Sequence, residues 1–575
     1  MKMRLIYIAC LATGLLLNSC GKDFLEKTPQ GQLGEGQILN GEGIEAVLLG
    51  AYSIMNGNVS GSWGNYAAAP SQWVFGEITS DNAHKGSEET DQPNMNLLEK
   101  MNPNPANDNL TTMWQVYFEG VLRSNTTLKV LKQDQEGNKE ISDARALEIQ
   151  AEARMLRAHY YFFMWRVFRN LPWIDETVTL EESKTKPNDT DIYDKIIEDV
   201  KFAADNLPLT KIKGEAGRMD KNIAKAYLGK LYLYQKKFDL ALPLFKEVIA
   251  GKDLTNMPFE DNFDVEKEDG PEALLVSKHA INPNGSADNA NVGDMLSGIY
   301  AAPVSCCGFY QPTIDLVNAY RVDANGLPYL DGEYRTSPYV SDYGLTAAQK
   351  ESYKLDVTLQ VDPRLDYTVG RRGVPFLDYG IMPGDAWIRK SEGYLQPDAG
   401  PFVGIKTMIK ESQFGNNAVA GESYITGLDV NIMRLADVYL MAAECAIELN
   451  DLQTALTYVN AVRNRAAKLP AKMVNGQPVA NYQVKPYPNF SSQDYARKAV
   501  RMERRLELAM EGHRFFDLVR WGIAKSVLET YSTFEGTYIP FFRGLVYNPH
   551  NDYFPIPQTE IDRSGGTLKQ NEGYY

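Results

Sequence analysis

Cysteine is scarce in this sequence, and the positions of the few cysteines exclude a structural zinc site. The 575 residues contain five cysteines, and Cys10 and Cys20 lie in the N-terminal segment. The others are Cys306, Cys307 and Cys445, and no Cys/His cluster has the spacing of zinc ligands. No cofactor is therefore expected, although loop carboxylates and carbonyls would suit a structural Ca²⁺.

The sequence also lacks any excess of positive charge. Lys and Arg number 59 against 74 Asp and Glu, which gives a formal net charge of -15. This balance argues against nucleic acid as a partner and against electrostatic docking to anionic lipid. Neutral ligands remain compatible with it. Aromatic residues make up 11%, including 33 Tyr and 7 Trp, which suits binding to the apolar faces of sugars.

Catalytic motifs are missing as well. No GxSxG, HExxH or phosphate loop occurs in a convincing context. The segment 503–517 is rich in acids, arginines and a histidine, but Glu503, Glu507 and Glu511 recur every four residues with arginines between them. That spacing is typical of ion-paired helices. We therefore predict buried or half-buried ion pairs that lock the last helices, a packing role for His513, and no enzymatic activity.

Long hydrophobic runs are confined to the N-terminus. Leu5 to Leu17 is too short to span a bilayer, so it is interpreted as the apolar core of a signal peptide over residues 1–19. Leu17-Asn18-Ser19-Cys20 resembles the lipobox of bacterial lipoproteins, in which the cysteine is acylated; an ordinary signal peptide with an incidental cysteine is the alternative. Several acyl chains, at about 0.8 kcal/mol per buried methylene, would hold the protein to a membrane.

The rest of the chain is predicted to form a lipidated tether over 20–40 and a single mainly α domain over 41–575. Helical periodicity dominates in separate blocks. The predicted helices are Ile44–Met55, Leu110–Gln133, Ser142–Phe168, Ile192–Asn206, Asn222–Gln235, Leu240–Ala250, Ile432–Leu449, Leu452–Ala467 and Gln493–Met510.

Two helix pairs follow the tetratricopeptide spacing of small and large residues. In the first pair, Gly229 and Ala241 are the small residues; in the second pair they are Ala443 and Ala455. Small residues at these positions let the paired helices approach closely. The pairs are about two hundred residues apart, and the irregular stretches at about 57–109 and 255–430 are predicted to be long loop inserts on the helical scaffold. Inserts of this length are usually functional, although they could also merely cover the helices.

The chain resembles the SusD/RagB family of nutrient-binding outer-membrane lipoproteins over essentially its full length. Asn431–Glu444 and Glu503–Trp521 are the most characteristic segments, and the chain closes with Pro555–Pro557 and Leu568–Tyr574. Ala151–Tyr160 resembles the N-terminal half of the family.

The resemblance implies a cell-surface glycan-binding protein of the starch-utilisation type. Such a protein lies on the extracellular face of the outer membrane, anchored by its lipid, and delivers oligo- or polysaccharide to a SusC-like TonB-dependent transporter. Two alternatives remain open. One is a peptide- or protein-binding member of a peptide importer, and the other is a glycoside hydrolase.

The first insert offers several candidate ligand contacts. Trp63 and Trp73 could form flat platforms for sugar rings, and Asn65 and Asn82 could hydrogen-bond hydroxyl groups. Asp81 is the preferred polar contact, because this stretch resembles the acidic step of the family's N-terminal loop. For each Trp, packing on the helices is an equally good interpretation.

The second insert contains the unusual pair Cys306-Cys307. Adjacent Cα atoms lie about 3.8 Å apart, which is shorter than the spacing of most disulfides, but an exported protein is in an oxidising environment. We hypothesise a vicinal disulfide with Tyr310 beside it as a sugar platform. Two reduced thiols, or a bridge to Cys445, are the alternatives. Arg372 and Tyr394, in an aromatic-rich stretch that also holds Arg389, are further candidate ligand contacts.

Overall fold

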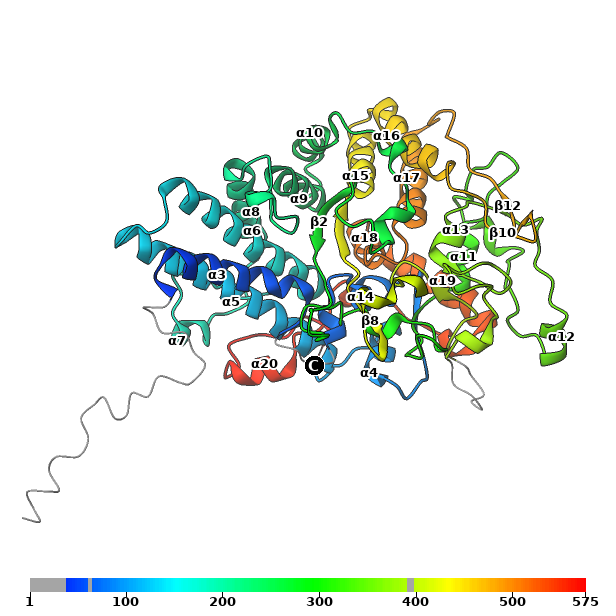
Figure 1. Ribbon diagram of the computed structural model, residues 1–575, viewed down its shortest axis with the longest axis horizontal. Helices are drawn as coiled ribbons and strands as arrows, with labels where there is room; N and C mark the ends of the chain where they lie inside the picture. Colours follow the sequence, from blue (N-terminus) through cyan, green and yellow to red (C-terminus); the bar gives the residue numbers. More distant parts are fainter. Residues whose placement is uncertain (1–37, 60–64, 390–397, 575) are drawn as a thin grey trace, which may run out of the picture.

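The predicted helical scaffold is confirmed by the computed structural model, which describes residues 38–59, 65–389 and 398–574. Helices of the N-terminal half stack side by side, and the remaining elements pack against one end of this stack (Figure 1). The N-terminal helices are α3 (Gly41–Tyr52), α5 (Asp108–Glu136), α6 (Asp143–Phe168), α8 (Tyr193–Asn206), α9 (Lys221–Tyr234) and α10 (Phe238–Ile249). All six were predicted to within a few residues at each end.

The two tetratricopeptide-like pairs are adjacent in space although they are distant in sequence. The second pair is α15 (Leu435–Glu448) and α16 (Leu452–Ala466), and α15 packs against α10 of the first pair (Figure 1). A buried ion pair of 3.2 Å between Lys230 and Asp437 joins α9 to α15. The scaffold is thus one continuous layer of helices. The second insert connects α10 to α15, two neighbouring helices of this layer.

Close helix packing depends on the small residues that the repeat spacing predicts. Gly229 in α9 faces the ring of Phe245 in α10, and a Cβ atom at Gly229 would lie 2.6 Å from that ring. No real Cβ makes so short a contact, so a larger residue would push the helices apart. The small residue of the pattern is therefore a packing requirement.

A two-stranded antiparallel ladder closes the second insert. β2 (Ala273–Ser277) pairs with β9 (Val430–Arg434), so the start and end of the insert lie side by side. The prediction that a helix begins at Ile432 is wrong, because Val430 to Arg434 form strand β9 and the helix begins at Leu435. The β-branched Val430 and Ile432 favour the extended conformation.

Short elements fill the two inserts. They form small ladders and single helical turns rather than a common sheet. Those that matter below are η3 (Asn65–Ala68), η4 (Trp73–Glu77), β1 (Ala83–Gly86), α4 (Pro93–Glu99), η7 (Glu260–Phe263), β3 (Phe309–Pro312), α11 (Ile314–Ala319), α13 (Leu365–Thr368), η10 (Asp385–Trp387), β6 (Val403–Gly404), α14 (Phe414–Asn417), β8 (Glu422–Thr426) and β10 (Met473–Val474).

The C-terminal helices confirm the prediction of buried ion pairs. α17 (Gln493–Leu508) corresponds to the last predicted helix. It is followed by three helices that were not predicted: α18 (Arg514–Arg520), α19 (Ala524–Tyr538) and α20 (Gln558–Arg563). Glu503 bonds to Arg364 at 2.8 Å and to Arg463 at 2.9 Å, and all three side chains are fully buried. The partners come from other parts of the chain rather than from the same helix. His513 is buried too, as expected for a packing histidine.

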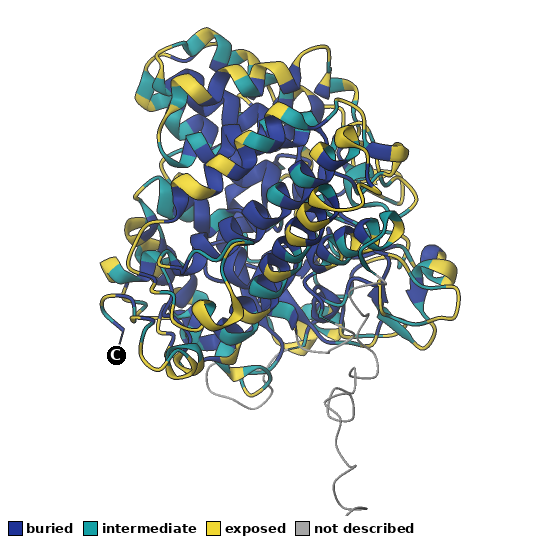
Figure 2. Ribbon diagram, turned by 90° about the vertical axis from the view of Figure 1, so that its left-hand side faces the viewer, coloured by how far each residue is buried: buried dark blue, intermediate teal, exposed yellow. Residues whose placement is uncertain are grey.

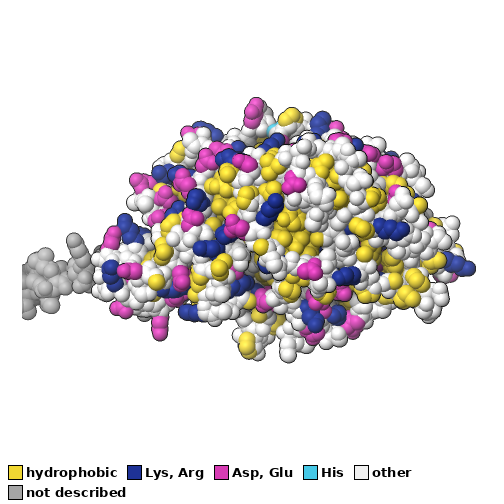
Figure 3. Space-filling view, turned by 90° about the horizontal axis from the view of Figure 1, so that it is seen from above, with side chains coloured by type: hydrophobic (Ala, Val, Ile, Leu, Met, Phe, Trp, Pro, Cys, Tyr) yellow, Lys and Arg dark blue, Asp and Glu magenta, His cyan; other side chains and the backbone are white. Residues whose placement is uncertain are grey.

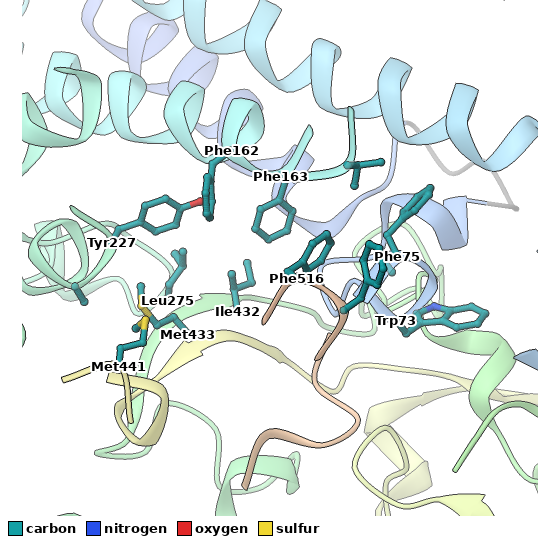
Figure 4. Close-up of a cluster of buried hydrophobic side chains, with 14 of the residues drawn as sticks. Trp73, Phe75, Phe162, Phe163, Tyr227, Leu275, Ile432, Met433, Met441 and Phe516 are labelled. Atoms are coloured by element: carbon teal, nitrogen blue, oxygen red, sulfur yellow. The ribbon is translucent and has the colours of Figure 1, made fainter. Parts of the chain in front are cut away.

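The hydrophobic core runs through the middle of the molecule, where the stack meets the inserts (Figure 2). Side chains from distant segments meet in it: Phe162 and Phe163 of α6, Ile432 of β9 and Phe516 of α18 lie near Trp73 and Phe75 of the first insert (Figure 4). Over the described residues, none of the helices is both long enough and apolar enough to cross a membrane.

Candidate ligand-binding site

Three of the predicted functional residues, Cys20, Trp63 and Tyr394, lie outside the described residues. The others can be placed. Most of them are in the interior rather than at the surface.

Trp73 is a core residue, and the expectation that it presents a surface platform is corrected. It lies in η4 with no exposed area, and its indole Nε1 donates to the carbonyl of Gly293 at 3.0 Å (Figure 4). Its ring packs against Tyr310, with 5.5 Å between ring centroids. Tyr310 is itself only 1% exposed, so neither ring can stack on an external sugar in this conformation.

Asp81 and Asn82 are also buried, which corrects their assignment as surface contacts. Both carboxylate oxygens of Asp81 accept hydrogen bonds from Arg514, at 2.8 and 2.9 Å, and Arg505 lies 3.1 Å away. Asn82 donates to Glu77 and accepts from Arg505, both at 2.9 Å. These residues therefore tie the first insert to the C-terminal helices.

Asn65 and Arg372 already have partners within the protein. The Asn65 amide is buried and donates to Asn58 at 3.1 Å. Arg372 pairs with Asp342 at 3.2 Å and also donates to the carbonyls of Pro383 and Lys350. Their roles as ligand contacts stay predictions.

Cys306 and Cys307 are joined by a disulfide bond, as hypothesised, while Cys445 is a free, buried thiol. The bridge to Cys445 is therefore absent from this structure. Cys306 is half-buried, whereas Cys307 is 8% exposed. Contact of the bridge with a ligand stays a prediction.

Near this disulfide the chain exposes an aromatic ring with a charged pair beside it. Tyr300 is 46% exposed, and the guanidinium of Arg389 lies over its ring at 5.0 Å from the centroid. Arg389 also donates to Asp91 at 2.8 Å, and Glu88 is 3.5 Å away. We call Tyr300, Arg389 and Asp91 the Tyr300 platform.

Backbone contacts in the second insert hold Tyr300 and Arg389 together. The N–H of Tyr300 donates to the carbonyl of Trp387 at 3.0 Å. Gly308 has a φ of +76°, and a Cβ there would lie 2.6 Å from the Cβ of Arg389, so only glycine permits this approach. The amide of Gln311 donates to the carbonyls of both Gly308 and Arg389, at 2.8 and 3.0 Å. These contacts place Arg389 beside the end of the Cys306–Cys307 turn.

The first insert supplies the carboxylate. β1 pairs with β3, and within β1 the buried Lys85 donates to the carbonyls of Glu88 and Asp91, each at 2.7 Å. The two inserts are thus joined by a ladder, and Asp91 is brought to Arg389. Tyr66 also lies near this carboxylate: burial, then the charge of Asp91, raises the pKa of its phenol, so the phenol stays protonated and able to donate at neutral pH.

The chemistry of the Tyr300 platform matches that of a sugar. The exposed ring can lie against the C–H groups of a pyranose, and the guanidinium and carboxylate can donate to and accept from its hydroxyls. Among the described residues no group of three or more His, Cys, Asp or Glu could hold a metal ion. A structural Ca²⁺ stays a prediction.

Sequence reasoning missed Asp91 and Tyr300. Both lie inside the predicted inserts, but nothing in the pattern distinguishes Tyr300 from the other 32 of the 33 tyrosines. Arg389 was named only as a neighbour of Tyr394. The position of Tyr300 six residues before the cysteine pair is the one local signal that could have pointed to it.

Asp91 lies two residues before α4. In Figure 1, α4 lies at the lower edge, whereas α10, α15 and α16 form the upper edge. The small core cluster that contains Ile299 and Ile388, the neighbours of Tyr300 and Arg389, supports the platform from within.

Comparison with known protein families shows the family to which the chain belongs. The sequence profile of the SusD family matches residues 271–574. The chain belongs to the SusD family. A second profile, described as starch-binding and associating with the outer membrane, matches residues 23–233 of this SusD-family chain. The resemblance found in the sequence is therefore confirmed, as is the mainly helical fold.

Individual relatives are similar to this SusD-family protein over nearly all of its length. SusD-like protein P25 of Formosa agariphila is 23% identical over 97% of both chains. A SusD-like protein of Bacteroides ovatus is 23% identical over 91% of this chain and 83% of its own. Among solved structures, a laminarin-binding SusD-like protein gives a TM-score of 0.66 at 23% identity, covering 93% of this chain and all of that one. These structural likenesses show the fold.

Proposed function

We propose that this SusD-family protein captures oligo- or polysaccharide at the bacterial surface and passes it to a SusC-like TonB-dependent transporter. It would be held on the extracellular face of the outer membrane by acyl chains on Cys20. The Tyr300 platform is the observation that carries this proposal, because it combines an exposed aromatic ring with a fixed donor and acceptor. Two of the solved relatives are named for binding laminarin or laminarihexaose, which supports a glycan ligand.

The form of the site favours weak, reversible binding. One ring and one charged pair on an open surface bury little of a polymer, so we expect a dissociation constant of roughly micromolar to millimolar. Arg389 and Asp91 already satisfy each other, which removes part of the ordering cost of binding. Such affinity suits a protein that must release its ligand to a transporter.

The tops of the paired helices form another face of the molecule. Figure 3 shows the molecule from above, with hydrophobic side chains in a band across the middle and charged groups around them. Exposed Leu240 of α10 and Leu449 after α15 are 46% and 45% accessible. Ligand capture on one face would leave this one available to a partner.

Isothermal titration calorimetry on the full-length protein in detergent tests the proposal. Starch, laminarin, fructan, mannan and pectin are titrated separately, together with a pool of peptides. We expect heat from at least one polysaccharide and no release of reducing ends. Tyr300→Ala and Arg389→Ala are each expected to weaken binding about 5- to 150-fold, since a lost stacked ring or hydrogen-bonding group costs about 1–3 kcal/mol.

Arg154→Ala is the matched control. The side chain of Arg154 is 23% exposed and pairs with Asp199, much as that of Arg389 is 21% exposed and pairs with Asp91, but it belongs to α6, outside both inserts. Its replacement should leave the affinity unchanged. The proposal would be overturned if the peptide pool bound and none of the polysaccharides did. Release of reducing ends from a polysaccharide would overturn it as well.

A further inference from the structure

A second depression with its own polar groups lies on the far part of the second insert. Its volume is about 220 Å³, which is smaller than that of most drug-sized ligand sites. We call it the Lys472 pocket. It is lined by Glu260 of η7, Tyr367 of α13, Leu377, Ile405 and Met408 in loops, and Lys472 just before β10.

Among the residues that the structure describes, none accepts a hydrogen bond from the ammonium of Lys472. Its Nζ lies 4.2 Å from the centroid of the Tyr367 ring, and within the described ranges it makes no hydrogen bond or ion pair. Burial lowers the pKa of Lys472, although the nearby Asp366 and Glu260 oppose this. The side chain of Lys472 is only half-buried, so a ligand oxygen would take the place of water at its ammonium.

Glu260 is the matching acceptor. Its carboxylate likewise has no hydrogen-bond or ion-pair partner among the residues that the structure describes, whereas the other charges of the pocket are satisfied. Lys410 pairs with Asp264. Asp378 accepts from the N–H groups of residues 411 and 412, at 2.7 and 3.0 Å. One donor group and one acceptor group of opposite charge therefore remain open.

The ligand that fits these groups is uncharged and carries hydroxyls. An anion would meet Lys472 but be repelled by Glu260, and a cation would be repelled by Lys472. A sugar hydroxyl can accept from one and donate to the other, while Leu377, Ile405 and Met408 lie against its C–H groups. We propose that the Lys472 pocket binds one neutral sugar unit, as a second subsite for the polysaccharide held at the Tyr300 platform.

This inference rests on the proposed function, and the fold connects the two places. Ile405 and Met408 of the pocket belong to the same small core cluster as Ile299 and Ile388, the neighbours of Tyr300 and Arg389. The two subsites are therefore held on one packed unit. Two weak contacts on one polymer chain raise the overall affinity through effective concentration, which explains how an open surface can retain a polysaccharide.

Saturation-transfer NMR on the full-length protein in detergent separates the two sites. The probes are maltose, cellobiose and laminaribiose, with the dipeptide Ala-Ala as the alternative class of ligand. We expect a sugar signal that persists in Tyr300→Ala and is lost when Lys472→Met and Glu260→Gln are added. The same pocket changes alone should weaken binding of the polysaccharide found by calorimetry about tenfold or more. Met and Gln keep the size of the replaced side chains, and the thermal midpoint reports on folding.

Lys525→Met serves as the control, because Lys525 is an exposed lysine of α19 that pairs with Glu529. It should change neither the NMR signal of the sugars nor the affinity for the polysaccharide. If Tyr300→Ala removes every sugar signal, the pocket does not bind sugar, while the proposed function stands. If the pocket changes leave both readouts unaltered, or if a Lys472-dependent signal comes from the dipeptide alone, the inference is overturned. Failure of every polysaccharide in calorimetry would overturn the proposed function as well.

Discussion

The carboxylate of Glu507 is bonded to three arginines from separate segments of the chain. It accepts from Arg434 at 2.6 Å, from Arg364 at 3.0 Å and from Arg465, and all four side chains are buried. Burial opposes ionisation, but the three guanidiniums outweigh it and lower the pKa of Glu507. Removing the charge of Glu507 leaves three buried guanidiniums with one carboxylate partner fewer each.

Glu507→Gln should therefore lower the free energy of unfolding by about 3–5 kcal/mol. Urea denaturation followed by circular dichroism measures this change. Glu448→Gln is the control, because Glu448 pairs with Arg497 near the surface at 2.7 Å. The control should cost less than about 1 kcal/mol. Equal losses in the two variants would contradict the structural role given to the buried network.

His84 should make stability depend on pH. It is fully buried between Glu535 at 2.9 Å and Glu99 at 3.2 Å. Burial lowers the pKa of His84, but the hydrogen bonds to both carboxylates outweigh this and raise it to about 9. The stabilisation is thus complete below pH ~6.5, which is the pKa of histidine in the unfolded chain. It is lost as the pH rises through about 9, the pKa of His84 in the folded protein.

Urea unfolding of wild type and His84→Gln at pH 6.5 and 9.5 tests this. The wild type should lose about 3 kcal/mol more than the variant between the two pH values. Other groups that titrate in this range cancel in the comparison. A parallel loss in both proteins would show that His84 is not the responsible group.

At the scale of elements, Gly229 tests whether the helix pairs need their small residues. Gly229→Ala puts a Cβ 2.6 Å from the ring of Phe245, so α9 and α10 must separate. The expected loss is about 1–3 kcal/mol, measured by thermal unfolding. Gly50→Ala in α3 is the control, because a Cβ there meets nothing within 4 Å. It should be neutral or stabilising by up to about 1 kcal/mol.

The helices could be predicted because each carries its own apolar periodicity. The β9 strand could not, because its partner strand β2 lies more than 150 residues earlier, and the local β preference of Val430 and Ile432 alone does not define a strand. The residues of the site could not be predicted either, because their partners are also distant in sequence. Asp81 and Asp91 are both acids in one irregular insert, and only the fold decides that Asp81 meets Arg505 and Arg514 inside while Asp91 meets Arg389 outside.

At the scale of the whole molecule, membrane attachment is predicted to depend on one atom, the sulfur of Cys20. Cys20→Ala should abolish incorporation of labelled palmitate, because no thiol then remains to be acylated there. Cys445→Ala should leave labelling unchanged, since Cys445 is a buried core residue. The readout is radiolabelled protein in the membrane fraction after gel electrophoresis. Persistent labelling of Cys20→Ala would rule out this mode of anchoring.

The bonds between Arg505 and the Asp81–Asn82 stretch span more than 420 positions of the sequence. Neither end can be completed until the other has been synthesised, since each leaves charged groups without partners. The first insert must therefore remain incompletely folded until α17 has been made. In the export route proposed above, final assembly would follow secretion, and a polypeptide truncated before α17 would be unable to finish folding.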